Sequence, residues 1–120
     1  MAKALGEFEQ LLIFALLSLP EDQAYGVPIR DAIEQRTGRS LSAGAVYTAL
    51  DRLQEKRLVS SHESAPTPER GGRRKRLYKL EPSGAQALAR SVQVFQDMSQ
   101  GLLPRLETML TGSQSGHNAP

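Results

Sequence analysis

A series of apolar residues at helical spacing in the last third of the sequence constrains the fold most. These residues recur three and four positions apart, as in a coiled-coil seam, with one polar interruption at Ser99. The core of a 120-residue chain is too small to cover a seam of this length. We therefore predict that the segment pairs with a partner subunit, although such a helix can also pack on its own domain. The seam consists of Ala85, Leu88, Val92, Phe95, Ser99, Leu102, Leu106 and Met109.

Proline and glycine divide this last segment. Pro82 suits the first turn of a helix, so we expect the helix over residues 82–111. Gly101 and Pro104 disturb the pattern, and we expect a kink or a break at these two residues. Residues 112–120 are small and polar, and we predict a disordered tail there.

Three shorter helices are predicted before the seam. The first covers residues 7–19, begins with acidic residues and ends at Pro20. Its apolar arc is wider than one contact face needs, so this helix can be buried on two sides. The second is expected over residues 27–36, with Gly38 as its C-terminal stop. The third, about residues 42–56, has the clearest amphipathic pattern.

The third helix is apolar on one side and small or polar on the other. Ser42 is a favourable N-cap for it. Tyr47 lies at the margin of the apolar arc, so half of its ring can belong to the core. The apolar side carries Val46, Ala49, Leu50 and Leu53, and the opposite side carries Gly44, Tyr47, Thr48, Asp51 and Arg52.

Two predicted strands follow, over residues 58–64 and 74–80, and the loop between them contains two prolines and two glycines. The net charge of the chain is only +2, but basic residues gather in this hairpin. Such a cluster suits contact with an anionic partner, although a charge run on a hairpin is often only solvated. The cluster consists of Arg70, Arg73, Arg74, Lys75, Arg76 and Lys79.

The order of these elements predicts a mainly α fold with a small β-hairpin, namely a winged helix-turn-helix with a C-terminal dimerisation helix. We assign residues 1–81 to the DNA-binding domain and residues 82–111 to the dimerisation helix. In this design the third helix enters the major groove of double-stranded DNA, and the basic wing, about residues 65–76, reaches the backbone. The predicted DNA contacts are Ser42, Gly44, Tyr47, Thr48 and Arg52 on the third helix and Arg70, Arg73, Arg74, Lys75 and Arg76 in the wing.

A second interpretation is a winged-helix domain that contacts only proteins, with its basic wing on an acidic partner. The exposed side of the third helix discriminates between the two, because a protein-binding face more often carries large apolar anchors. Gly44, Ala45 and Thr48 instead permit close approach to a groove, which favours DNA.

Catalysis and cofactor binding have little support in the sequence. The chain has no cysteine, which excludes disulfides and thiolate metal sites. His62 and His117 are isolated, and no catalytic arrangement, phosphate-cradling loop or metal-ligand spacing occurs. We therefore predict no enzyme activity, no metal and no cofactor. The apolar run 11–19 is too short to span a bilayer, so we expect no membrane contact and a cytoplasmic location.

Several short motifs occur in a fixed order along the chain. They are the pair Tyr25-Gly26, the third-helix pattern of Ser42, Gly44, Tyr47, Leu50 and Leu53, and the wing from Arg73 to Tyr78 with Ser83-Gly84 after it. In this order and spacing they resemble the PadR family of bacterial transcriptional regulators, and the likeness covers roughly residues 7–110. Arg57 is a departure, because the family often has glycine there. The turn after the third helix must then do without glycine or accept a strained left-handed backbone.

The resemblance implies a homodimeric winged-helix repressor that binds palindromic operators. In short members of the family, the first helix and a single C-terminal helix build the dimer. Some of them bind flat aromatic compounds between tryptophans at this interface, but this chain has no tryptophan. A small-molecule effector at the dimer interface is therefore one possible partner. Phe8 or Phe95 could line its pocket, but packing in the core is the more common role for either residue. The predicted interface residues are Phe8, Leu12, Leu88, Val92, Phe95, Leu102 and Leu106.

Overall fold

The computed structural model describes residues 4–65 and 74–118, with the backbone alone for residues 113–118. Three helices come first, then a hairpin, then two more helices, which confirms the predicted mainly α fold with a small β-hairpin. The elements are α1 (Glu7–Ser18), the 3-10 turn η1 (Glu21–Gln23), α2 (Gly26–Thr37), α3 (Ala43–Glu55), β1 (Val59–Glu63), β2 (Arg76–Leu80), α4 (Pro82–Ser99) and α5 (Leu103–Asn118).

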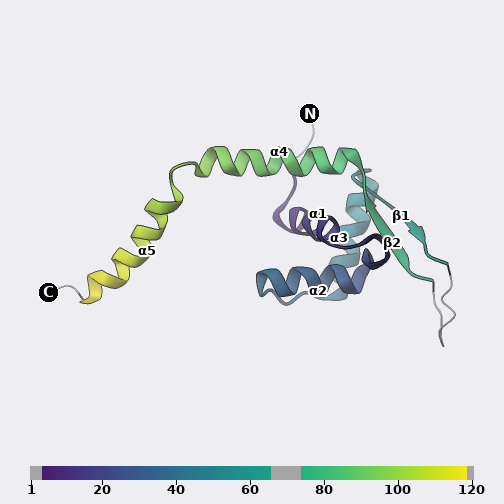
Figure 1. Ribbon diagram of the computed structural model, residues 1–120, viewed down its shortest axis with the longest axis horizontal. Coiled ribbons are helices and arrows are strands. Elements are labelled where there is room, and N and C mark those ends of the chain that lie inside the picture. Colours follow the sequence, from purple (N-terminus) through teal and green to yellow (C-terminus); the bar gives the residue numbers. More distant parts are fainter. Residues whose placement is uncertain (1–3, 66–73, 119–120) are drawn as a thin grey trace.

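The first three helices gather into one group, with the β1–β2 hairpin on one side of it (Figure 1). α4 crosses over this group, and α5 extends away from it. β1 and β2 are antiparallel, in a register that pairs Val59 with Leu80 and Glu63 with Arg76. No helix of the described chain is both long and apolar enough to span a membrane.

The core lies where the apolar faces of α1, α2 and α3 meet. Leu12 and Ile13 of α1, Ile29 of α2, and Leu50 and Leu53 of α3 are completely buried there. Removal of these side chains from water is the main favourable term that holds the three helices together. The hairpin adds two buried residues to this cluster, and the start of α4 adds two more; they are Val59, Tyr78, Ala87 and Leu88.

The helix-turn-helix unit is held by local contacts at its turn. Gly38 ends α2 with a left-handed backbone, at a φ of 73°. The Glu34 carboxylate accepts a hydrogen bond from the Leu41 N–H at 2.7 Å, which orders the segment before α3. The Ser42 hydroxyl then accepts from the Ala45 N–H at 3.1 Å, so the predicted N-cap is confirmed.

The turn from α3 to β1 contains the strained left-handed backbone that a non-glycine residue at position 57 can require. The Leu58 N–H donates to the Leu53 carbonyl, and the Arg57 N–H donates to the Gln54 carbonyl. This pair of bonds is a Schellman motif, whose C′ residue has a left-handed backbone and is usually glycine. Here the C′ residue is Arg57, with a φ of 61°.

Arg57→Gly is expected to raise the free energy of unfolding by about 1 kcal/mol, because glycine adopts this backbone without a Cβ clash. Urea unfolding of the two proteins measures the difference. Lys56→Gly is the matched control, since Lys56 has an ordinary right-handed backbone and glycine there should not stabilise. Equal stability of wild type and Arg57→Gly would contradict the expectation.

The C-terminal segment is two helices rather than the single one predicted over residues 82–111. α4 ends at Ser99, and Gly101 takes a left-handed backbone at a φ of 76°. Pro104 then lies in the first turn of α5, where its missing N–H breaks no helical bond. The break was therefore expected at the right place.

The end of α5 also differs from expectation, because helical backbone continues to Asn118 instead of giving way to a disordered tail at residue 112. No proline occurs between Pro104 and Pro120 to stop the helix, and serine, glutamine and histidine tolerate helical backbone at small cost.

Candidate nucleic-acid interface

The predicted DNA-reading side of α3 is exposed. Because Val46 and Leu50 turn inward to the core, the opposite side of the helix faces solvent. The five predicted α3 contacts, Ser42, Gly44, Tyr47, Thr48 and Arg52, are all exposed. A Cβ built at Gly44 meets nothing within 4 Å, so another surface can approach the backbone closely there.

Tyr47 combines packing with exposure. A Cβ at Gly26 would lie only 2.2 Å from the Tyr47 hydroxyl oxygen, so the phenol ring lies directly over the first residue of α2. Even so, 42% of Tyr47 remains exposed. Glycine at position 26 therefore leaves room for the Tyr47 ring, and the Tyr47 hydroxyl is positioned at the N-terminus of α2.

Two basic residues at the C-terminal end of α3, Arg52 and the C-cap Lys56, lie near the Glu9 carboxylate of α1. Burial alone would raise the pKa of the Glu9 carboxyl, but hydrogen bonds from the Lys56 amine and the Gly6 N–H, with the charges of Lys56 and Arg52, lower it below its ordinary value. Lys56 Nζ lies 2.6 Å from Glu9 Oε2. Arg52 and Lys56 therefore have an anionic neighbour within the chain.

The hairpin is anchored to the helices by its second strand. Tyr78 is buried, and its N–H donates to the Ala24 carbonyl at 2.8 Å. Burial raises the pKa of the Tyr78 hydroxyl, and the negative charge of Asp51 raises it further. Since both its backbone and its ring are fixed, Tyr78 sets the position from which the neighbouring basic residues project.

Three of the five predicted wing cations fall in the described chain, and each has a different neighbour. Arg74 Nη1 lies 3.6 Å from Glu63 Oε2. Lys75 Nζ donates to the Tyr25 hydroxyl at 3.3 Å and lies 4.5 Å from the centre of that ring. Arg76 Nη1 donates to the Ser61 hydroxyl at 2.9 Å. The other two, Arg70 and Arg73, lie outside the described residues.

Tyr25 belongs to this site, and sequence reasoning did not assign it a role there. Lys75 comes fifty residues after it, so no local spacing could reveal their contact. Tyr25 is also the N-cap of α2 and makes no side-chain cap. The start of α2 therefore combines uncapped N–H groups, two tyrosine hydroxyls and one ammonium group, which is a combination that suits an anion.

The predicted interface residues separate into three groups. Leu12 and Leu88 are buried in the core of their own chain and offer no free surface. Phe8 and Val92 are half-buried against that core. Phe95, Leu102 and Leu106 are exposed, as are other large apolar residues of α4 and α5, namely Val94, Met98, Leu103, Met109 and Leu110.

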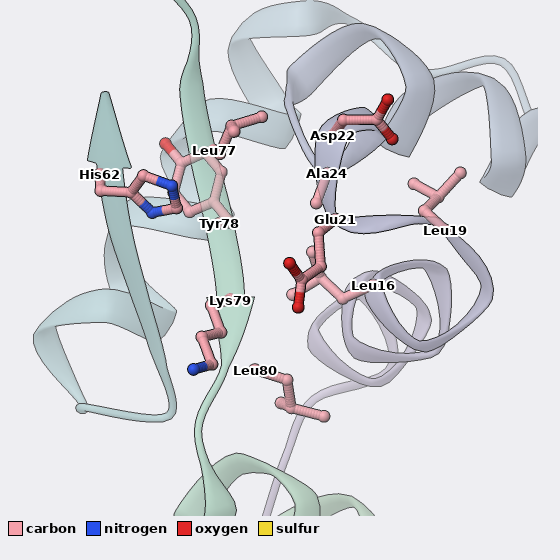
Figure 2. A pocket seen from close by; sticks show the side chains of 10 residues that line it. All are labelled: Leu16, Leu19, Glu21, Asp22, Ala24, His62, Leu77, Tyr78, Lys79 and Leu80. Carbon is pink, nitrogen blue, oxygen red and sulfur yellow. The ribbon is translucent and has the colours of Figure 1, made fainter. Parts of the chain in front are cut away.

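A depression of about 420 Å³ lies between β2 and the segment from α1 to η1. Figure 2 shows its lining, with Leu16 and Leu80 toward its apolar part and Glu21 reaching in from η1. None of the predicted DNA-binding or interface residues lines it. It therefore does not coincide with the expected effector position at the seam.

Comparison with known proteins identifies the family of this chain. Residues 15–90 match the family described as transcriptional regulator PadR-like. A PadR family transcription regulator from Clostridium difficile is 26% identical, with a TM-score of 0.66 over 82% of this chain and 98% of that one. A PadR-like transcriptional regulator from Bacillus cereus shares the fold, with 18% identity and a TM-score of 0.66 over 82% and 90% of the two chains.

One curated relative is an uncharacterized 37.1 kDa protein in transposon Tn4556 of Streptomyces fradiae, 38% identical over 81 residues. The match covers 68% of this chain but only 21% of that protein. The family match, in contrast, covers the whole of α2, α3, the hairpin and the start of α4. This chain belongs to the PadR-like family of transcriptional regulators, which bind DNA.

Proposed function

We propose that the protein is a homodimeric repressor that reads a palindromic operator, with α3 in the major groove and the wing on the adjacent backbone. The observation that carries this proposal is the exposed side of α3, which is small and hydroxylic and lies beside a hairpin that presents basic residues. Gly44 and Thr48 allow the backbone to approach base edges. The face lacks the large apolar anchors of a protein-binding surface, apart from Tyr47, whose ring packs on Gly26.

In this proposal Lys75 is the main phosphate contact of the described wing. Its ammonium group contacts the Tyr25 phenol and pairs with no carboxylate of the described residues, so it is available to a phosphate. The Tyr47 hydroxyl and the uncapped start of α2 lie on the same side and add donors for the same strand of DNA.

The dimer follows from the apolar residues of α4 and α5 that the chain leaves exposed. Contiguous apolar surface of this kind on a soluble protein marks an interaction site. In a two-fold dimer each subunit places one α3 on one half-site, so the operator should be palindromic.

Fluorescence anisotropy of labelled duplexes at several salt concentrations tests the proposal. A duplex that carries the natural operator, selected from genomic fragments, should bind at least about 100-fold more tightly than a scrambled duplex. Lys75→Ala should weaken binding to both and reduce the salt slope by about 0.9, the value for one lost phosphate contact.

Lys79→Ala is the matched control, because Lys79 pairs with Ser60 at the base of the hairpin, away from the wing. Its salt slope should equal that of the wild type. If no genomic fragment bound better than scrambled DNA, the repressor function would be refuted. If Lys75→Ala kept the full slope, Lys75 would not contact a phosphate.

A further inference from the structure

Arg76 makes contacts that differ from those of the other described wing cations. Its Nη1 donates to the Ser61 hydroxyl at 2.9 Å, and that hydroxyl donates to Gln54 Oε1, also at 2.9 Å. Arg76 belongs to β2, Ser61 to β1 and Gln54 to α3. One serine hydroxyl thus links both strands of the hairpin to the third helix.

Arg76 also lies beside negative charge. It lines the same depression as Asp51 and Glu55, two residues four positions apart on α3, together with Gln54. These two carboxylates outweigh the single charge of the guanidinium and would repel a phosphate group brought to it. Within residues 4–65 and 74–112, in contrast, the Lys75 ammonium group contacts the Tyr25 phenol and forms no ion pair.

The link acts at the end of the hairpin nearest the wing. Glu63 and Arg76 form the last strand pair before the connecting loop. The middle of the hairpin is held by the bond from Tyr78 to Ala24, and its other end by the Schellman turn at Arg57. Without the link, the wing end of the hairpin has less to fix its distance from α3.

We propose that Arg76 is a positioning residue that acts through Ser61 and Gln54 to hold the wing end of the hairpin, at residues 74–76, at a fixed spacing from α3. This inference rests on the proposed DNA-binding function and refines it, because it removes Arg76 from the predicted phosphate contacts. A fixed spacing lets α3 and the wing fit one duplex together. It therefore affects the preference for the operator more than the general affinity for DNA.

The test compares Ser61→Ala, Arg76→Ala and the double variant by anisotropy on operator and scrambled duplexes over a salt series. Ser61→Ala is informative because it breaks the link without a change of charge. Each single variant should lower the preference for the operator about 3- to 10-fold and leave the salt slope at its wild-type value. The double variant should be no worse than either single one, because both remove the same link.

Arg74→Ala is the matched control, since Arg74 forms an ion pair with Glu63 of β1 and has no hydrogen bond or ion pair to α3 in the described part of the chain. It should weaken binding to both duplexes equally and lower the salt slope. A readout without DNA is the side-chain amide resonance of Gln54 in the free protein, which should shift in both Ser61→Ala and Arg76→Ala.

Two results would overturn the inference. One is an Arg76→Ala variant whose salt slope falls by about 0.9 while Ser61→Ala keeps full operator preference, which would make Arg76 a phosphate contact. The other is a Gln54 amide resonance that neither variant moves. Failure of the wild type to distinguish operator from scrambled DNA is a different outcome, which refutes the proposed function.

Discussion

Phe95→Asp is expected to turn the proposed dimer into a monomer and to raise its dissociation constant at least about 1,000-fold. Phe95 is 65% exposed in the single chain, in the middle of the apolar surface of α4. At a dimer interface its ring is removed from water, and a carboxylate in its place is buried without a partner. Such burial costs several kcal/mol, and about 4 kcal/mol corresponds to this change in affinity.

Sedimentation equilibrium measures the effect, and Gln93→Asp is the matched control. Gln93 lies two residues earlier on α4, which places it on the opposite side of the helix, and it is exposed. The control adds the same charge and should remain a dimer. Loss of the Phe95→Asp dimer should also abolish tight operator binding, because one subunit contacts only one half-site. An unchanged dimer would show that this surface is not the interface.

Gly84→Ala is expected to lower the free energy of unfolding by about 3 kcal/mol. The added Cβ would lie 2.2 Å from the Leu58 carbonyl oxygen and 2.6 Å from Leu80 Cδ1. The carbonyl cannot move freely, because it accepts a hydrogen bond from the Glu81 N–H at 3.0 Å. The first turn of α4 must therefore shift, which disturbs the packing of Ala87 and Leu88 on the core.

Gly44→Ala is the control, since its Cβ meets no atom within 4 Å. Alanine near the start of α3 should leave stability unchanged or raise it by about 0.5 kcal/mol. Thermal melts at equal protein concentration compare the variants, and Gly84→Ala should melt about 10 °C below wild type. Equal melting temperatures for the two alanine variants would contradict the close approach at Gly84.

The sequence predicts the elements well where the signals are local. Pro20, Gly38 and Ser42 act within one helical turn, so the ends of the first three helices lie within a residue or two of the expected positions. The break before Pro104 is local in the same way. The predicted end of the helix at residue 111 was too early, because Gly112 and the small polar residues after it do not stop α5.

The seam shows a second limit of sequence reasoning. Spacing predicts which residues share an apolar face, but it does not tell whether that face packs on the same chain or on a partner. Leu88 and Phe95 have the same periodicity, yet Leu88 is buried against its own core and Phe95 is exposed. α4 begins on the helical group, and its later part extends beyond that group (Figure 1).

The candidate DNA site shows a third limit. The exposed face of α3 follows from its periodicity, and it was predicted correctly as an exposed surface. The neighbours of Lys75 and Arg76 depend on how the hairpin folds back onto α2 and α3, so Tyr25 and Gln54 could not be assigned from spacing.

The close contact between Tyr47 and Gly26 also constrains how the protein can evolve. Any larger residue at position 26 meets the phenol ring, so it must displace the Tyr47 side chain from its place above α2. Gly44 has open space around it, and Thr48 is exposed on the same side of α3. The fold therefore tolerates substitutions at positions 44 and 48, while a change at position 26 requires an adjustment at position 47.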